Sequence, residues 1–208
     1  MARRKAAETA GQAGKPTREM LLDVAGELLA DVGIERISTN LICRQAGVTP
    51  PTLYHYFSDK YAVLEALGTR LMDRQNDALV AWIARHAGRG LEGYAGHLAE
   101  LLHETAAITR AQPGGVWIER SLHATPNLTH VRIASHEYVT GKLTEAFAPL
   151  LPHLTRDEVW LRMRVAVEFG YVATEMVSSS PESRRDAIFA ETARIQRLAM
   201  LDGASPQG

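Results

Sequence analysis

The chain has 208 residues, of which 46% are hydrophobic and 23% are charged, and its formal net charge is −1. This composition is typical of a folded protein with a substantial core, and it excludes a strongly basic, non-specific nucleic-acid coat. No run of about 18 apolar residues occurs, so we expect no transmembrane helix. The single cysteine, Cys43, excludes an internal disulfide and favours a reducing compartment, so we expect a cytoplasmic protein without a secretion signal.

Positive charge is concentrated at the N-terminus. Residues 1–16 are rich in Ala, Gly and charged side chains and lack apolar periodicity, which predicts a disordered basic arm. A solvated tail and an arm that settles on phosphates are both consistent with this pattern. The cations that face the single carboxylate of Glu8 are Arg3, Arg4, Lys5, Lys15 and Arg18.

Helical signals begin at Thr17, a predicted N-cap, and Gly33 predicts the end of the first helix. Helical periodicity continues along the chain, and no alternating strand pattern occurs. We expect an all-α fold of about nine helices, with a domain at 17–64, a larger domain at 65–202 and a disordered tail at 203–208. The later helices are predicted at 39–46, 50–57, 58–86, 91–110, 116–122, 127–150, 156–178 and 182–201.

A short helix, a tight turn and a second short helix follow one another between Ser38 and Lys60. This is the plan of a helix-turn-helix, whose second helix enters the major groove of DNA. Gly47 supplies the left-handed backbone that the turn requires. Thr49 can cap the second helix, and the outer face of that helix carries hydroxyls and aromatic rings suited to phosphates and base edges.

This stretch closely resembles the N-terminal domain of the TetR/AcrR family of regulators over about residues 17–67. The resemblance implies an all-α protein with an N-terminal three-helix helix-turn-helix DNA-binding domain and a C-terminal helical domain for ligand binding and dimerisation. Cys43 and Pro51 depart from the family's commonest residues without breaking the motif. The matching residues are Ala46-Gly47-Val48-Thr49, Thr52-Leu53-Tyr54-His55-Tyr56-Phe57, Lys60 and Leu64, with Ala25, Leu28, Gly33 and Thr39 upstream.

The matched positions imply a set of DNA contacts, to which the basic cluster adds Arg18. We expect Phe57 to pack between the short helix and the long helix that follows it. For Tyr54 a DNA contact and core packing are both open. The predicted DNA-binding residues are Arg18, Thr39, Thr49, Pro50, Thr52, Tyr54, His55, Tyr56 and Lys60.

The family dimerises through its last two long helices, which correspond here to 156–178 and 182–201. Their apolar stripes predict a homodimer interface, although such stripes could equally belong to the core of one chain. Two reading helices about 34–36 Å apart would then contact the two half-sites of a palindrome. The predicted interface residues are Val159, Met163, Ala166, Val167, Gly170, Thr174, Ile188, Ile195 and Leu198.

The resemblance also implies a small-molecule pocket among the middle helices. Such pockets are mostly apolar with a few polar groups, and any one of these side chains could instead belong to the core. Trp117 with Glu119 is the predicted switch position. The candidate ligand-binding residues are Trp82, His86, Tyr94, Leu98, Leu102, Trp117, Ser121, His123, Tyr138, Met163 and Phe169.

No residue pattern indicates catalysis or a metal site. The eight histidines include no pair at i, i+4 spacing and no His-Glu-x-x-His motif, and Glu100-x-x-His103 has no second copy. No Gly-rich phosphate loop or nucleophile motif occurs. We therefore expect no metal, no cofactor and no enzymatic activity.

Together these observations predict a homodimeric transcriptional repressor that a small-molecule effector releases from a palindromic double-stranded DNA operator. A helical ligand carrier or small enzyme with an incidental helix-turn-helix is one alternative, and it would act without a specific DNA complex. An architectural DNA-binding protein is another, and it would lack an effector cavity. Activation instead of repression also stays open, because the sign depends on where the operator lies.

Overall fold

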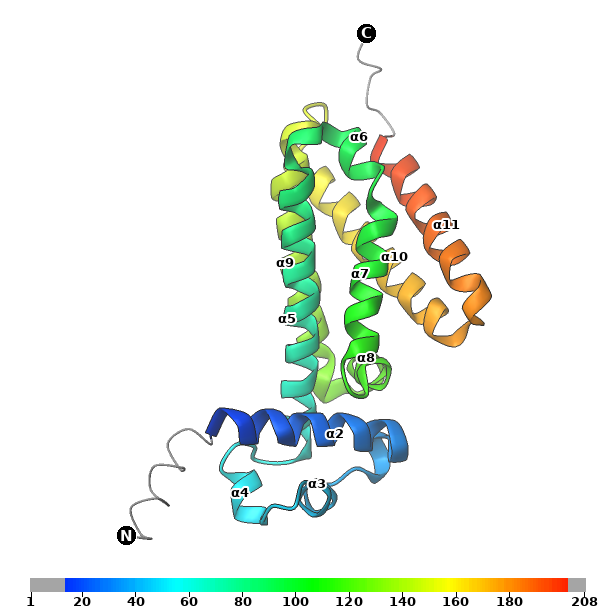
Figure 1. The fold of residues 1–208 in the computed structure, drawn as a ribbon. Helices are drawn as coiled ribbons and strands as arrows, with labels where there is room; N and C mark the ends of the chain where they lie inside the picture. The colour runs from blue at the N-terminus through cyan, green and yellow to red at the C-terminus, as the bar shows by residue number, and fades with distance from the viewer. Residues whose placement is uncertain (1–13, 202–208) are drawn as a thin grey trace, which may run out of the picture. The chain divides into compact units, whose positions relative to one another are not determined.

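The structure, a computed structural model, describes residues 14–201 (Figure 1). This part of the chain contains helices and no strands, which confirms the all-α prediction, and none of its helices has the length and apolar character needed to cross a membrane. The α-helices are α2 (Gly14–Arg36), α3 (Thr39–Ala46), α4 (Pro50–Tyr54), α5 (Lys60–His86), α6 (Gly90–Ala95), α7 (Leu98–Ala111), α8 (Gly115–Ala124), α9 (Thr129–Phe147), α10 (Arg156–Ser179) and α11 (Glu182–Leu201). Short 3₁₀ helices are η1 (Ala87–Arg89), η2 (Pro126–Leu128) and η3 (Ala148–Leu150).

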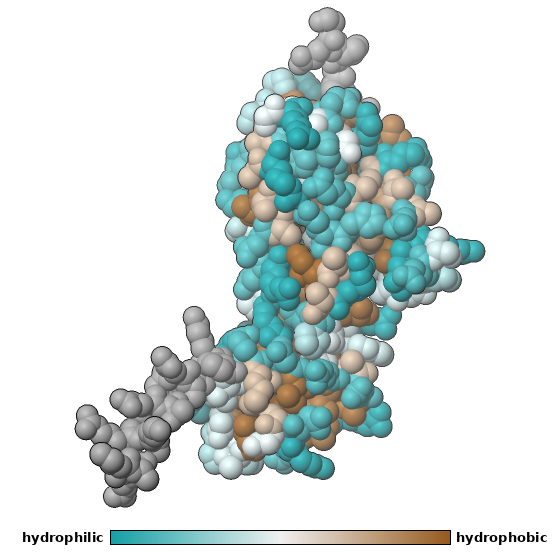
Figure 2. Space-filling view, viewed as in Figure 1, coloured by the Kyte–Doolittle hydropathy of each residue, from teal (hydrophilic) through white to brown (hydrophobic). Residues whose placement is uncertain are grey.

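The helices form two compact units. Within the described residues, unit 1 comprises residues 14–71 together with Arg110–Val131, and unit 2 comprises Met72–Thr109 and residues 132–201. This division differs from the predicted domains 17–64 and 65–202, because α8 packs on α2 and so belongs to unit 1. Hydrophilic residues cover most of the face drawn in Figure 2, and hydrophobic residues appear there in small patches.

The start of α2 differs from the prediction. The helix begins at Gly14, not at Thr17, so residues 14–16 of the predicted arm are helical. Residues 1–13 of that arm and the predicted tail at 203–208 lie outside the described residues. Gly33 has φ 74°, which interrupts the helical conformation where the sequence predicts an end, and one further turn then reaches Arg36.

The predicted helix at 91–110 is two helices, α6 and α7. In a continuous helix the amide of His97 would donate to the carbonyl of Gly93. Instead the His97 ring nitrogen Nδ1 lies 2.7 Å from that carbonyl oxygen, and the His97 amide donates to Tyr94 at 3.0 Å. The side chain thus replaces the backbone at this carbonyl, and Gly96, a poor helix former, lies at the break.

In unit 1, α3 and α4 lie on the same side of α2 (Figure 1). On its α8 side, α2 meets the turn before α8 at Gly26. A Cβ at Gly26 would overlap the carbonyl oxygen of Pro113. A Cβ at Gly114, whose φ is 67°, would likewise overlap the carbonyl oxygen of Gly26. Only glycine on both sides permits this contact between two backbones.

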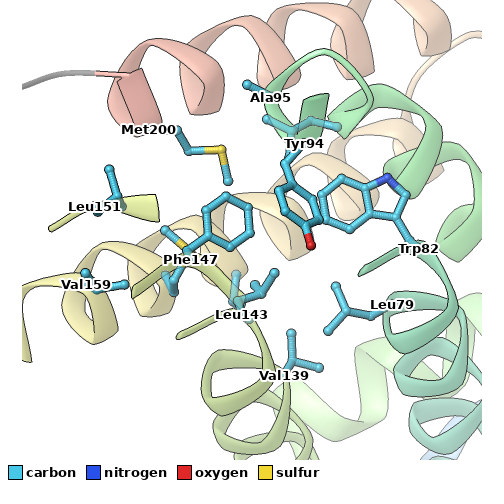
Figure 3. Packing of buried hydrophobic residues seen from close by; sticks show 13 residues of the cluster. Leu79, Trp82, Tyr94, Ala95, Val139, Leu143, Phe147, Leu151, Val159 and Met200 are labelled. Atoms are coloured by element: carbon cyan, nitrogen blue, oxygen red, sulfur yellow. The ribbon is translucent and has the colours of Figure 1, made fainter. Parts of the chain in front are cut away.

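The core of unit 2 is built around aromatic rings. Figure 3 shows Tyr94 between Phe147 and Trp82, with ring centroids 4.8 Å and 5.4 Å away. The Trp82 indole N–H donates to the carbonyl of His97 at 3.0 Å, so its polar group is satisfied. The aliphatic and thioether side chains around the rings are Leu79, Leu98, Val139, Leu143, Leu151, Val159, Met163, Val167 and Met200.

A buried polar cluster lies between α9 and α10. His136 donates from Nδ1 to Glu168 Oε1 at 2.8 Å, and its ring stacks on Tyr171 with the centroids 4.0 Å apart. Arg132 and Arg164 also pair with Glu168, at 3.8 and 2.8 Å. Burial lowers the pKa of His136 to about 4, although the Glu168 carboxylate opposes this shift. In the described part of the chain, His136 Nε2 is buried without a hydrogen-bond partner.

Gly26→Ala should lower the free energy of unfolding by about 1–3 kcal/mol, because the added methyl group overlaps the Pro113 carbonyl. Gly141→Ala is the matched control, since a Cβ at Gly141 on α9 meets nothing within 4 Å. There alanine should stabilise the helix by about 0.5–1 kcal/mol. Urea unfolding followed by circular dichroism measures both effects. Equal stability of the two variants would contradict the backbone contact between α2 and the turn before α8.

Stability should fall as the pH drops from about 6.5 to about 4 because of His136. Its pKa in the folded protein lies below the ordinary value of 6.5, so the unfolded chain binds the proton more readily over this interval. Between pH 7.5 and pH 5 we expect a loss of roughly 2 kcal/mol from this group. Urea unfolding at both pH values should show a smaller loss in His136→Gln. The exposed control His130→Gln should keep the full loss, and an unchanged pH dependence in His136→Gln would refute the assignment.

Candidate nucleic-acid interface and buried cavity

The segment from Ser38 to Tyr54 forms a helix-turn-helix. The Ser38 hydroxyl accepts the amide N–H of Leu41 at 3.2 Å and so caps α3. Gly47 ends α3 in the left-handed conformation, with φ 66°, as the sequence predicts. Ile42 and Leu53 are fully buried and hold the two short helices in unit 1. The helix α4 has five residues, so it depends on this packing for its stability.

The outer face of α4 is accessible. The Tyr54 side chain is 52% exposed, so it does not pack in the core, while Phe57 is buried as expected. Of the other predicted DNA-binding residues in this segment, Thr39, Thr52 and Tyr56 are half-buried, and Thr49, Pro50 and His55 are exposed.

Side-chain hydrogen bonds order this face. Thr39 Oγ1 and the Tyr54 hydroxyl are 3.2 Å apart, which links α3 to α4. Thr49 occupies the N-cap position, but its hydroxyl contacts the Thr52 hydroxyl at 3.0 Å instead of a backbone amide. Pro50 and Pro51 have no amide hydrogens, and the amide of Thr52 donates to the Thr49 carbonyl at 3.0 Å. Four hydroxyls therefore stand in fixed pairs on the surface of the two helices.

The predicted basic contacts are partly engaged within unit 1. Arg18 pairs with Glu19 at 3.1 Å and lies 5.4 Å from the Phe57 ring centroid. Lys60 donates to the carbonyl of Ile34 at 3.2 Å, and its ammonium group has further N–H donors. The sequence reasoning missed Arg44, an exposed cation on α3. Its position one helical turn after Asn40, on the polar side of α3, was the available signal.

A cavity of about 90 Å³ lies within unit 2. Of the predicted ligand-binding residues it includes Trp82, Leu98 and Leu102. The prediction missed most of its lining, although Gln75 and Leu79 lie on the same face of α5 as Trp82. The other lining residues are Gln75, Asn76, Leu79, Leu101, Thr105, Val139, Leu143, Ala166, Val167, Gly170, Tyr171, Thr174, Gln196 and Met200.

The remaining predicted ligand residues do not line this cavity. Tyr94 and Met163 are core residues of unit 2. His86 is buried nearby, stacked on His97 at 4.2 Å, and burial lowers its pKa. Periodicity alone does not tell the inner face of a helix from its outer face, so the other candidates lie elsewhere. These are Trp117, Ser121 and His123, which lie in unit 1, and Tyr138 and Phe169, which are exposed in unit 2.

Most of the predicted dimer-interface residues face the interior of unit 2 in the single chain. The stripe on α10 faces the core of unit 2: Val159, Met163, Val167 and Thr174 are buried, and Ala166 and Gly170 line the cavity. Ile188 on α11 is half-buried and packs on a second apolar cluster. Ile195 and Leu198 are exposed, as an interface requires.

A different apolar surface remains open on these two helices. A groove of about 280 Å³ lies on it, lined by residues of both helices that include Leu161, Val165 and Ile195. We call the surface the α10–α11 face, and it comprises Leu161, Val165, Phe169, Val172, Met176, Ile195 and Leu198.

Comparisons with known proteins agree with this geometry. Residues 21–67 match the family model "Bacterial regulatory proteins, tetR family". The chain is 37% identical over 60 residues to the class D tetracycline repressor protein of Escherichia coli, and 36% identical over 53 residues to the HTH-type transcriptional regulator UidR of Escherichia coli K12. These alignments cover 29% and 26% of this chain and 28% and 27% of the two relatives, so the chain matches less than a third of their length.

The fold likeness extends further. A crystal structure of a TetR-family transcriptional regulator from Streptomyces coelicolor matches with a TM-score of 0.60 and 22% identity, over 88% of this chain and 97% of that one. Residues 21–67 are therefore similar to the helix-turn-helix domain of the TetR family, and the chain shares its fold with that solved regulator over most of its length.

Proposed function

We propose that the chain is a homodimeric transcriptional repressor that binds a palindromic DNA operator through α4 and is released by a small-molecule effector. The observation that carries the proposal is an exposed five-residue helix on a family-matched helix-turn-helix, held from behind by the fully buried Leu53. A helix in this position fits the major groove of B-form DNA.

The side chains on this surface divide into two roles. Pro50 and Tyr54 present apolar edges that suit thymine methyl groups, and the paired hydroxyls of Thr49 and Thr52 suit phosphates or base edges. Lys60 and Arg44 add charge for phosphates, which sets affinity more than specificity.

The α10–α11 face supports the dimer. A monomer seldom exposes so many large apolar side chains on two adjacent helices, and a second copy would remove them from water. An interface of this kind is isologous, so its two-fold axis would match a palindromic operator.

The cavity in unit 2 supports the effector. In one dimer conformation the two α4 helices would have a spacing that does not fit the operator. A ligand that binds this conformation more tightly than the DNA-binding one would lower DNA affinity, by at most the ratio of its two affinities. The coupling requires no chemistry at the cavity.

Selection of bound duplexes from a random pool tests the proposal. We expect an inverted repeat with half-site centres about one helical turn apart. Ligand binding without any enriched duplex would favour a helical carrier instead.

Tyr54→Ala should weaken binding to the selected duplex by about tenfold or more at fixed salt, since one base or phosphate contact contributes roughly 1–3 kcal/mol. Tyr138→Ala is the control, because Tyr138 in unit 2 is also exposed, at 46% against 52% for Tyr54. Fluorescence anisotropy measures both dissociation constants. Equal losses of DNA affinity in the two variants would show that Tyr54 on α4 does not contact the DNA.

Val165→Glu should dissociate the dimer, because each interface would bury two unpaired carboxylates. Val80→Glu on α5 is the matched control, since Val80 is exposed outside the α10–α11 face. Sedimentation equilibrium should show about a hundredfold weaker dimer for Val165→Glu and no change for Val80→Glu. A dimer that tolerates Glu at position 165 would place the interface elsewhere.

A further inference from the structure

The chemistry of the cavity lining limits the ligand that it can hold. The lining residues come from α5, α7, α9, α10 and α11, and among the described residues that form it there is no Asp, Glu, Lys, Arg or His. A charged group inside would therefore lose its water without gaining a counterion, which costs several kcal/mol per ion in protein interiors.

Charged side chains lie near the cavity, but they already form ion pairs with one another. One charged cluster lies behind the lining residue Tyr171, where Glu168 is paired with His136, Arg132 and Arg164. The low pKa of His136 keeps its ring neutral near pH 7. Neither a carboxylate nor an ammonium ion in the cavity would find a partner in this set.

Most polar groups of the lining are also engaged internally. The hydroxyl of Thr105 donates to the carbonyls of Leu101 and Leu102, and that of Thr174 donates to the carbonyl of Gly170. Gln75 donates to Thr109 at 2.8 Å. Because these polar groups are already hydrogen-bonded within the protein, most of the cavity lining offers a ligand apolar contacts.

Two amides retain hydrogen-bonding capacity toward a ligand. Asn76 uses its carbonyl oxygen to accept from Ser135 at 2.8 Å, which leaves its NH₂ group as a donor. Gln196 uses its NH₂ group on the carbonyl of Ala166 at 2.8 Å, which leaves its carbonyl oxygen as an acceptor. One neutral oxygen function, such as a hydroxyl or a carbonyl, matches these groups.

We propose that the cavity binds a small, neutral, largely apolar molecule with one hydroxyl or carbonyl oxygen, and that it rejects organic carboxylates and ammonium ions of the same size. The volume of about 90 Å³ is smaller than the roughly 150 Å³ of an engineered cavity that holds benzene, so it indicates a short chain of a few non-hydrogen atoms. The inference rests on the proposed function only in identifying this molecule as the effector.

The test compares three probes of nearly equal size: 1-butanol, butyrate and butylammonium. Calorimetric titration of the full-length protein near pH 7 should show one butanol molecule per chain. Binding of the two ions should be at least about tenfold weaker, a difference of about 1.4 kcal/mol. An ion that binds within tenfold of the alcohol, or an alcohol that does not bind, would overturn the inference.

Substitution of Gly170 tests whether the ligand binds in this cavity, and Gly141 provides the control. A Cβ at Gly170 would lie 3.6 Å from Leu102 and 4.0 Å from Gln196, at ordinary contact distance, so Gly170→Leu should fill the cavity. Gly141→Leu is the control, because a Cβ there meets nothing within 4 Å. Butanol affinity should fall about tenfold or more only in Gly170→Leu, and Gly170→Ala serves if the leucine variant does not fold. Unchanged affinity in the folded Gly170 variant would overturn the inference.

DNA binding is measured separately on the ligand-free protein. Its absence would refute the proposed function and leave the probe measurements unaffected. Conversely, a protein that binds an operator but prefers butyrate would keep its proposed function and lose the proposed effector class.

Discussion

The proposed DNA contact depends on the burial of Leu53. A five-residue helix cannot sustain itself in water, and α4 has no amide hydrogens at its first two positions. Leu53 fixes α4 against unit 1, and the Thr39–Tyr54 hydrogen bond fixes its rotation relative to α3. The outer side chains of α4 are therefore preorganised, so little side-chain entropy remains to be lost on binding DNA.

The path of the chain explains how a ligand in one unit could affect the other. Residues 110–131 leave unit 2 after α7, fold into unit 1 and return through α9. Within unit 1 they include the turn that contacts α2 at Gly26. The chain thus passes between the two units at three points, along α5, at the end of α7 and near the start of α9.

Sequence reasoning predicted what depends on local chemistry. Gly47, Ser38 and the prolines of α4 act through their own backbone and near neighbours, so the helix-turn-helix could be recognised from residue types and spacing. The split between α6 and α7 could not, because it accompanies a contact of the His97 side chain with the Gly93 carbonyl that residue type and spacing do not reveal.

The inner and outer faces of α10 were also beyond sequence reasoning. Apolar residues occur on both sides of this helix, so periodicity could not decide between Val159 and Met163 on one side and Leu161 and Val165 on the other. Only the positions of the neighbouring helices decide which set is buried. The cavity was missed for the same reason: its lining gathers residues from five helices, and no single stretch of sequence carries that pattern.

Guanine N7 methylation interference on a bound duplex tests the central claim most directly, because N7 lies in the major groove. If α4 is the reading helix of a symmetric dimer, interference should occur in two clusters related by two-fold symmetry and centred about one helical turn apart. Interference confined to a single cluster, or bound duplexes indifferent to major-groove methylation, would contradict the account.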